Sequence, residues 1–162
     1  MGIRISTSKE NVNWKKVSEL LAYFGLSHEN AETTELIFKR SYAVTFAYDE
    51  EQLIGCARAL SDGIKQAAVY NIALDEAYHG QQIGRKIIES IIEQVKGCTI
   101  ILYTHPKTVA MYEKFGFRRQ KTGMVYLNDQ EEAEWMQETG FLLPENYRFL
   151  DNEYEQTIEK RI

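Results

Sequence analysis

A loop that could bind a phosphate group lies between an apolar strand at residues 67–74 and an amphipathic helix at about 82–96. The loop reads His79-Gly80-Gln81-Gln82-Ile83-Gly84, and isoleucines recur at helical spacing after it. A glycine-containing loop that runs into a helix directs several backbone N–H groups at one point, where the helix dipole adds about half a positive charge. The pattern favours an anion site, although glycines in such loops also serve as plain turn residues.

A second segment whose residues could take part in a reaction lies further along the chain. Thr99-Ile100-Ile101-Leu102-Tyr103 is apolar enough for another strand, and Met111-Tyr112-Glu113-Lys114-Phe115-Gly116-Phe117 follows it. The latter predicts a short helix that carries a tyrosine and ends at Gly-Phe. A phosphate loop, a strand and a tyrosine-bearing helix together are far more specific than the loop alone.

With these motifs the chain resembles the GNAT superfamily of N-acetyltransferases. The family's phosphate loop reads Arg or Gln, two residues, Gly, one residue, then Gly or Ala, and this register falls on His79, Gln82 and Gly84. The family's later signature falls on Met111, Tyr112, Gly116 and Phe117. The segment Ile54-Gly55-Cys56-Ala57-Arg58-Ala59-Leu60-Ser61-Asp62-Gly63 is similar to a bacterial and plant subgroup that includes serotonin N-acetyltransferase-like enzymes. The resemblance covers roughly residues 42–128.

The resemblance implies an α+β fold with a central, mostly antiparallel sheet flanked by helices. It also implies acetyl-coenzyme A as cosubstrate and direct transfer of its acetyl group to a primary amine, either a small arylalkylamine or polyamine or a protein lysine or N-terminus. The backbone of residues 72–74 would bind the pantetheine arm, and the loop would bind the pyrophosphate. The implied coenzyme-binding residues are Ile72, Ala73, Leu74, His79, Gly80, Gln81, Gln82, Ile83, Gly84 and Arg85.

Two loop residues depart from the family pattern. Gln82 replaces a glycine. Because glutamine also has a backbone N–H, we expect this group to remain available to an anion if the φ of Gln82 is negative. His79 replaces Arg or Gln, which keeps a hydrogen-bonding side chain but weakens the fixed positive charge. Arg85 and Lys86, in the first helical turn, either face the coenzyme phosphates or are solvated surface charges.

Tyr112 is the catalytic residue that the resemblance implies. A phenol with a pKa of about 10 can protonate a departing thiolate of pKa about 8–9. The alternative is a core tyrosine beside Phe115 and Phe117. No general base is assigned, because Asn71 cannot act as one and Asp62 and Asp75 both remain open. Tyr23, Phe24, Tyr103 and His105 suggest an aromatic wall for the acceptor.

Other function classes fit less well. A coenzyme-binding regulatory or interaction module that has lost turnover is the alternative, and the departures at His79 and Gln82 and the presence of Asn71 motivate it. A dinucleotide-dependent oxidoreductase is disfavoured by the loop's glycine spacing. Cys56 and Cys98 are expected to be core or near-core thiols, and the scattered histidines predict no metal site.

Composition predicts a globular chain, since 44% of the 162 residues are hydrophobic and 27% are charged. The net charge of −5 argues against nucleic acid as a partner, and no apolar run is long enough for a membrane span. A cytoplasmic location is therefore expected.

The expected elements combine antiparallel hairpins with a later strand-helix-strand unit. Strands are expected at 3–6, 42–48, 52–60, 67–74, 98–104, 117–121 and 123–128, and helices at 13–24, 31–40, 82–96 and 107–115. Residues 1–128 would form the acetyltransferase domain, and residues 129–162 a helical C-terminal extension. That extension either packs on its own domain or covers a neighbouring subunit, so a homodimer is possible.

Overall fold

The computed structural model describes residues 2–145 and 147. The chain divides into two compact units, Met1–Leu102 and Tyr103–Ile162. The expected boundary after residue 128 stays a prediction. Most of the part of the expected C-terminal extension that follows Glu145 lies outside the described residues.

The first unit contains a five-stranded mixed sheet in the order β1-β2-β3-β4-β5. All neighbouring strands are antiparallel except β4 and β5, which are parallel. The strands are β1 (Ile3–Ser6), β2 (Ala43–Asp49), β3 (Gln52–Ser61), β4 (Gln66–Leu74) and β5 (Thr99–Ile101). This arrangement confirms the expected mostly antiparallel sheet.

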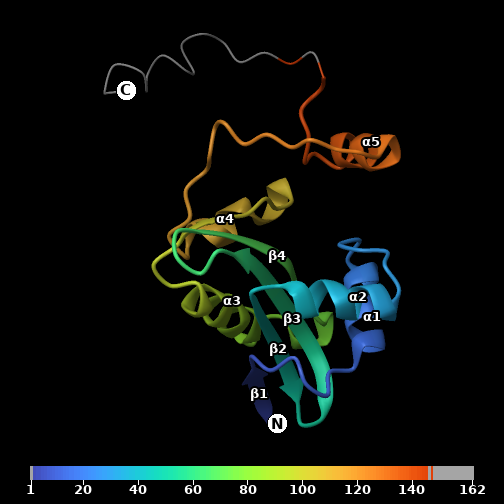
Figure 1. Cartoon of the computed structure of the whole chain (residues 1–162), viewed down its shortest axis with the longest axis vertical. Coiled ribbons are helices and arrows are strands. Elements are labelled where there is room, and N and C mark those ends of the chain that lie inside the picture. The colour runs from blue at the N-terminus through green and yellow to red at the C-terminus, as the bar shows by residue number, and fades with distance from the viewer. Residues whose placement is uncertain (1, 146, 148–162) are drawn as a thin grey trace. The chain divides into compact units, whose positions relative to one another are not determined.

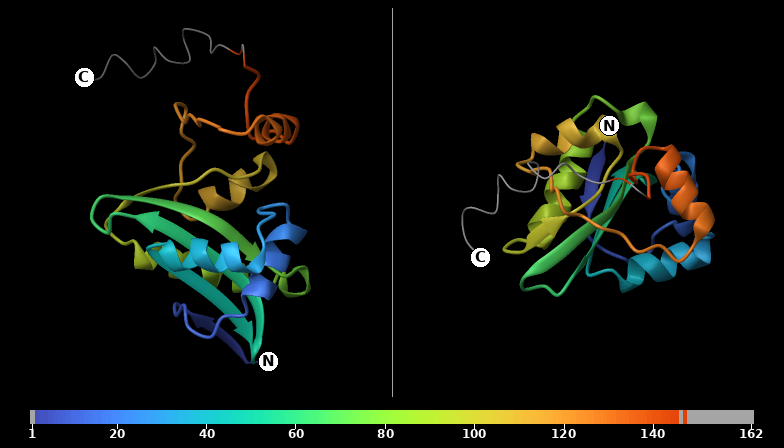
Figure 2. Two further views of the ribbon diagram at one scale, coloured as in Figure 1. Left: turned by 45° about the vertical axis from the view of Figure 1, so that its right-hand side comes forward. Right: turned by 90° about the horizontal axis from the view of Figure 1, so that it is seen from above.

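Helices cover both faces of this sheet (Figures 1 and 2). α1 (Trp14–Tyr23) and α2 (Ala31–Arg40) lie on one face, and α3 (Ile83–Gln94) lies on the other. The core under α1 and α2 includes Leu21, Phe38 and Phe46, whereas the core under α3 consists mainly of alanines and isoleucines. The small strand residues let α3 approach the sheet closely, as a Cβ on Gly55 would lie 2.6 Å from Ile87 Cδ1.

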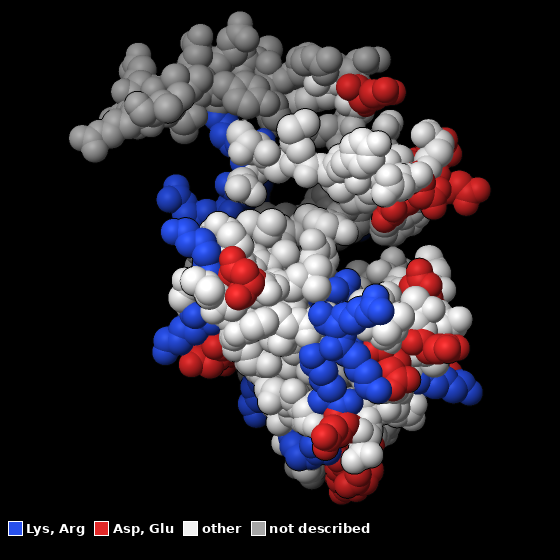
Figure 3. Space-filling model, in the orientation of Figure 1, with Lys and Arg blue, Asp and Glu red and all other residues white. Residues whose placement is uncertain are grey.

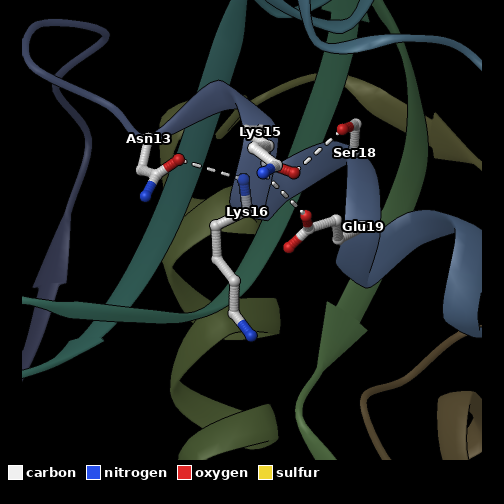
Figure 4. Close-up of polar contacts among 5 residues, drawn as sticks. All are labelled: Asn13, Lys15, Lys16, Ser18 and Glu19. Carbon is white, nitrogen blue, oxygen red and sulfur yellow. Dashed lines mark hydrogen bonds and ion pairs between the residues drawn. The ribbon is translucent and has the colours of Figure 1, made fainter.

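The start of α1 is fixed by local polar contacts (Figure 4). The side-chain oxygen of Asn13 accepts a hydrogen bond from the backbone N–H of Lys16 at 3.1 Å, as an N-cap residue does. Lys15 and Glu19 form an ion pair one turn apart, at 3.9 Å. These contacts stabilise the first turns of the helix whose last turn carries Tyr23.

The second unit contains a 3-10 helix η2 (Pro106–Thr108), α4 (Val109–Glu113) and α5 (Gln130–Glu138). Phe141, which follows α5, packs against Trp135 in a stacked arrangement and against Tyr103 and His105 edge-on. Trp135 and Phe141 therefore pack within the second unit.

Four of the expected elements differ from the structure. The strand expected at 98–104 is limited to Thr99–Ile101, and the helix expected at 107–115 begins as a 3-10 turn and ends at Glu113. The strands expected at 117–121 and 123–128 are not formed among the described residues. The apolar run at 124–127 suits a strand, but a strand also needs a hydrogen-bonding partner. Instead, Arg119 forms an ion pair with Glu113 of α4, at 2.9 Å, and Lys121 and Thr122 form a turn.

Charged side chains of both signs lie next to one another on the face that Figure 3 displays. Within the described part of the chain, every helix is too short or too polar to cross a membrane.

Candidate active site

The expected phosphate loop connects the end of β4 to the start of α3. Asp75 begins the 3-10 helix η1 (Glu76–Tyr78), and its carboxylate accepts a hydrogen bond from the N–H of Ala77 at 3.0 Å. The chain then turns through Gly80, whose φ of +77° requires the freedom of a glycine. The first backbone N–H groups of an α-helix have no acceptor within the helix, so the start of α3 can receive an anion here.

The conformation of Gln82 differs from the expectation of a negative φ. Gln82 has φ +65°, in the left-handed region, and precedes α3 without making a side-chain cap hydrogen bond. A residue with a Cβ is strained there, whereas glycine is not. The loop thus keeps the conformation that suits glycine although the side chain is a glutamine.

We expect Gln82→Gly to raise the free energy of unfolding by about 0.5–1 kcal/mol. Removal of the Cβ relieves the strain of the left-handed conformation and stabilises the folded state by about 1–2 kcal/mol. The greater conformational freedom of glycine in the unfolded chain offsets about 0.5–1 kcal/mol of this gain. Denaturant unfolding of the free protein measures the change. Gln81→Gly is the matched control, because Gln81 has no positive φ and its side chain bonds to Ala77 O, so that variant should lose stability. Equal losses in both variants would show that residue 82 is unstrained.

The side chains of His79 and Arg85, the two basic candidates at the loop, contact other groups of the protein. His79 Nε2 lies 2.7 Å from the carbonyl oxygen of Leu74, so this nitrogen carries the proton and donates it. The His79 ring also stacks on Phe24, with 6.2 Å between centroids. Arg85 Nε donates to Glu89 one turn along α3, at 2.7 Å. Recognition of an anion by this loop would therefore depend chiefly on backbone N–H groups.

The second half of β4 borders an open sheet edge. β5 pairs only with Gln66–Ala68, so it does not cover residues 69–74. Asp75 donates its N–H to Ile54 O on β3, and successive backbone groups alternate between the two edges of a strand. Ile72 and Leu74 therefore direct their backbone groups to the open edge, whereas those of Ala73 face β3. The structure brings these residues next to the loop, since a Cβ on Gly84 would lie 3.7 Å from Leu74.

Tyr112 is buried on α4, in the second unit. Its ring contacts Phe117 edge-on at 5.9 Å, and Gly116 allows the chain to turn back with a φ of +91°. Burial raises the pKa of Tyr112 above its ordinary value of 10, and a hydrogen bond with Thr104 offsets part of that shift. The phenol is thus protonated at neutral pH and able to donate a proton.

An acidic cavity of about 270 Å³ lies where the last turns of α1 approach η1. Its lining residues are Lys16, Glu19, Leu20, Tyr23, Asp75 and Glu76. The Tyr23 hydroxyl donates to Glu76 at 2.9 Å, and this hydrogen bond raises the Tyr23 pKa. Glu19 is partly balanced by Lys15 (Figure 4). Among the expected acceptor residues, Tyr23 lies in this cavity, while Glu19 and Glu76 were not expected there.

Asp62 and Cys56 have structural roles. Asp62 accepts hydrogen bonds from the N–H groups of Ile64, Lys65 and Gln66, which lower its pKa and make it a weaker base. Cys56 is fully buried, and burial raises its pKa to about 12. Only about one thiol in 10⁵ would be ionised at pH 7, so Cys56 is a core residue and not a nucleophile.

The mixed sheet, the half-open β4 and the glycine-containing loop before α3 are the arrangement expected of the acyl-coenzyme A transferase class. Residues 40–119 match the family model described as "Acetyltransferase (GNAT) domain". The chain therefore belongs to the GNAT acetyltransferases and is an enzyme of that family. The expected family membership and fold are confirmed.

Relatives and solved structures agree with this assignment. The chain is 26% identical over 137 residues to GCN5-related N-acetyltransferase 1, chloroplastic, of Arabidopsis thaliana, which covers 80% of this chain and 70% of the relative. It is 24% identical over 123 residues to serotonin N-acetyltransferase 2, chloroplastic, of Oryza sativa subsp. japonica, which covers 72% and 62%. A probable acetyltransferase from Staphylococcus aureus has a similar fold, with a TM-score of 0.69, 24% identity and coverage of 79% and 100%. An aminoglycoside 6'-N-acetyltransferase complexed with coenzyme A matches with a TM-score of 0.55, 23% identity and coverage of 62% and 61%.

Proposed function

We propose that this protein transfers the acetyl group of acetyl-coenzyme A directly to a primary amine. The observation that carries the proposal is the turn at residues 79–84, which joins the open half of β4 to the start of α3. Pyrophosphate would bind to the backbone of the loop and the first turn of α3, at His79, Gly80, Gln81, Gln82, Ile83, Gly84 and Arg85. The pantetheine arm would run along residues 72–74, with hydrogen bonds to Ile72 and Leu74.

The acidic cavity supports a cationic acceptor. Glu76 and Asp75 lie beside the end of β4 and would attract a protonated amine, while Tyr23 and Leu20 offer apolar surface to its carbon skeleton. A small arylalkylamine or polyamine fits this composition, and a protein lysine or N-terminus carries the same charged group. Loss of a proton from an amine of pKa about 10.4 at pH 7 costs roughly 4–5 kcal/mol, so a carboxylate or water must accept it. Asp75 is the better of the two carboxylate candidates, because it lines the acidic cavity and accepts one backbone hydrogen bond, whereas Asp62 accepts three within its own turn.

Tyr112 would donate a proton to the departing coenzyme thiolate. The amine nitrogen would attack the thioester carbon, a C–N bond would form as the C–S bond breaks, and the thiolate would take the phenolic proton. The buried Cys56 thiol is consistent with direct transfer without an acyl-enzyme.

Ligand binding and turnover test the proposal separately. A ligand that binds only the folded state at a hundredfold excess over its Kd adds about 2.7 kcal/mol of stability, so coenzyme A should raise the unfolding temperature. Release of free thiol is then measured with a panel of arylalkylamines, polyamines and lysine peptides. Binding without turnover on any amine would favour a catalytically weak coenzyme-binding module, and no shift at millimolar coenzyme would contradict the cofactor. Ping-pong initial-rate kinetics would contradict direct transfer.

The rate with saturating acetyl-coenzyme A should rise with pH through the neutral-to-alkaline range and fall only above pH 10. The rise reflects deprotonation of the amine, and the fall reflects ionisation of Tyr112. Because the pKa of Tyr112 is raised, the falling part of the pH–rate profile moves to higher pH. Initial rates across this pH range are the measurement. A decline well below pH 10 would assign the acid to another group. In Tyr112→Phe the alkaline decline should be absent and the rise retained.

A cytoplasmic location and a possible homodimer stay predictions. The names of both relatives described above include a chloroplastic location, so localisation of the tagged full chain is the direct test.

A further inference from the structure

The middle of β4 contains a β-bulge. Arg58 pairs with Tyr70 and Cys56 pairs with Ala73, so the single residue Ala57 on β3 faces two residues on β4. One of these, Asn71, has φ +56° in the left-handed region. A non-glycine residue in this conformation needs support from its surroundings, although asparagine tolerates it better than most.

The bulge reverses which edge each later residue of β4 faces. Gln66 O accepts a hydrogen bond from Asp62 N, so residue 66 faces β3. Unbroken alternation would turn Asp75 to the opposite edge, yet Asp75 N donates to Ile54 O of β3. The side chains exchange faces too, since Val69 packs with the α3 core and Ala73 packs with the α1 and α2 core. Without the bulge, Ile72 and Leu74 would face β3 instead of the open edge.

Arg58 holds the residue at the centre of this bulge. Its Nε donates a short hydrogen bond to Asn71 Oδ1, and its guanidinium lies over the Tyr70 ring, 5.0 Å from the centroid. Arginine has only donors, so the oxygen of the Asn71 amide must face it. Arg58 is half-buried, which protects the contact from full solvation.

We propose that Arg58 is a positioning residue for acetyl transfer, which acts through Asn71 to hold the bulge that turns Ile72 and Leu74 to the open edge of β4. The inference rests on the proposed function, in which that edge binds the coenzyme arm. Arg58 itself need not contact the coenzyme. A displacement of about 1 Å in bound reactants can reduce a rate by about 10²-fold. A small shift of the bulge would therefore lower the rate of acetyl transfer.

Arg58→Met removes the hydrogen bond and the cation over Tyr70 while keeping an unbranched side chain. Arg4→Met is the matched control, because Arg4 lies over the ring of its own cross-strand partner Tyr48, 4.4 Å from the centroid, at the other end of the sheet. We expect Arg58→Met to lower kcat/KM for acetyl-coenzyme A by about 10–100-fold and to weaken coenzyme A binding in calorimetry. Arg4→Met should change neither.

A double-mutant cycle with Asn71→Gly tests the route of the effect. Glycine accepts the left-handed φ but offers no side chain to Arg58, so Asn71→Gly alone should cause a similar loss. Arg58→Met should then cause little further loss in that background. Additive losses, or a loss no larger than in Arg4→Met, would overturn the proposal. Should Arg58→Met not fold, wild-type behaviour of Asn71→Gly would overturn it.

Hydrogen exchange of the free protein separates this inference from the proposed function. The Asp75 amide, which donates to Ile54 just beyond the bulge, should exchange faster in Arg58→Met than in wild type or Arg4→Met. Unchanged exchange contradicts the role of Arg58. Failure of the wild-type protein to bind coenzyme A contradicts the proposed function and leaves this exchange result interpretable.

Discussion

Replacement of Tyr112 by phenylalanine should lower kcat by about 10²–10⁴-fold, the usual contribution of a general acid. The ring is buried against Phe117 and is retained in the variant, so the packing of α4 should persist. Coenzyme A affinity should stay near that of wild type, because the hydroxyl acts only on the departing thiolate. Steady-state kinetics on the best amine of the panel, together with calorimetry of coenzyme A, measure both quantities.

Tyr48→Phe controls for loss of a phenol hydroxyl as such. Tyr48 is a buried tyrosine on β2, outside the proposed site residues, and burial raises its pKa as it does that of Tyr112. Turnover should be unchanged in this variant. Wild-type turnover in Tyr112→Phe would make Tyr112 a packing residue, the alternative that its motif leaves open.

Gly84→Asp should reduce coenzyme A affinity at least 100-fold, about 2.7 kcal/mol, and abolish the thermal shift with coenzyme. An added Cβ at Gly84 meets only Leu74 Cδ2, at 3.7 Å, an ordinary van der Waals contact. A carboxylate in the first turn of α3 also suits the helix dipole, so the free protein should keep its stability. The same carboxylate would repel the phosphates from the N–H groups that are proposed to bind them.

Gly84→Ala separates bulk from charge. It adds the same Cβ without the carboxylate, so it should retain more coenzyme affinity than Gly84→Asp. Calorimetry and thermal unfolding of both variants are the measurements. Normal coenzyme binding by Gly84→Asp would show that the pyrophosphate does not bind at the start of α3.

Local sequence patterns were sufficient for the two elements on either side of the proposed phosphate loop. Isoleucines at helical spacing after a glycine-containing loop predicted α3, and the apolar run at 67–74 predicted β4 to within one residue. Both patterns depend on residues that are close in the chain, where the period of the backbone alone decides which side chains share a face. The family assignment followed from the same segments, because the loop and the tyrosine-bearing helix each occupy a few consecutive residues.

Non-local contacts decided what the patterns could not. The apolar run at 124–127 suits a strand, yet no strand forms there among the described residues, since a strand forms only where another edge supplies hydrogen bonds. The φ of Gln82 and the bulge at Asn71 likewise depend on how the chain closes around them. Arg58 reaches Asn71 only because β3 and β4 pair in one particular register, which brings together residues thirteen positions apart. Sequence alone determined which residues could serve an acetyltransferase. The tertiary structure decided how β4 turns its backbone toward the open edge, because register is a property of paired strands and not of either strand by itself.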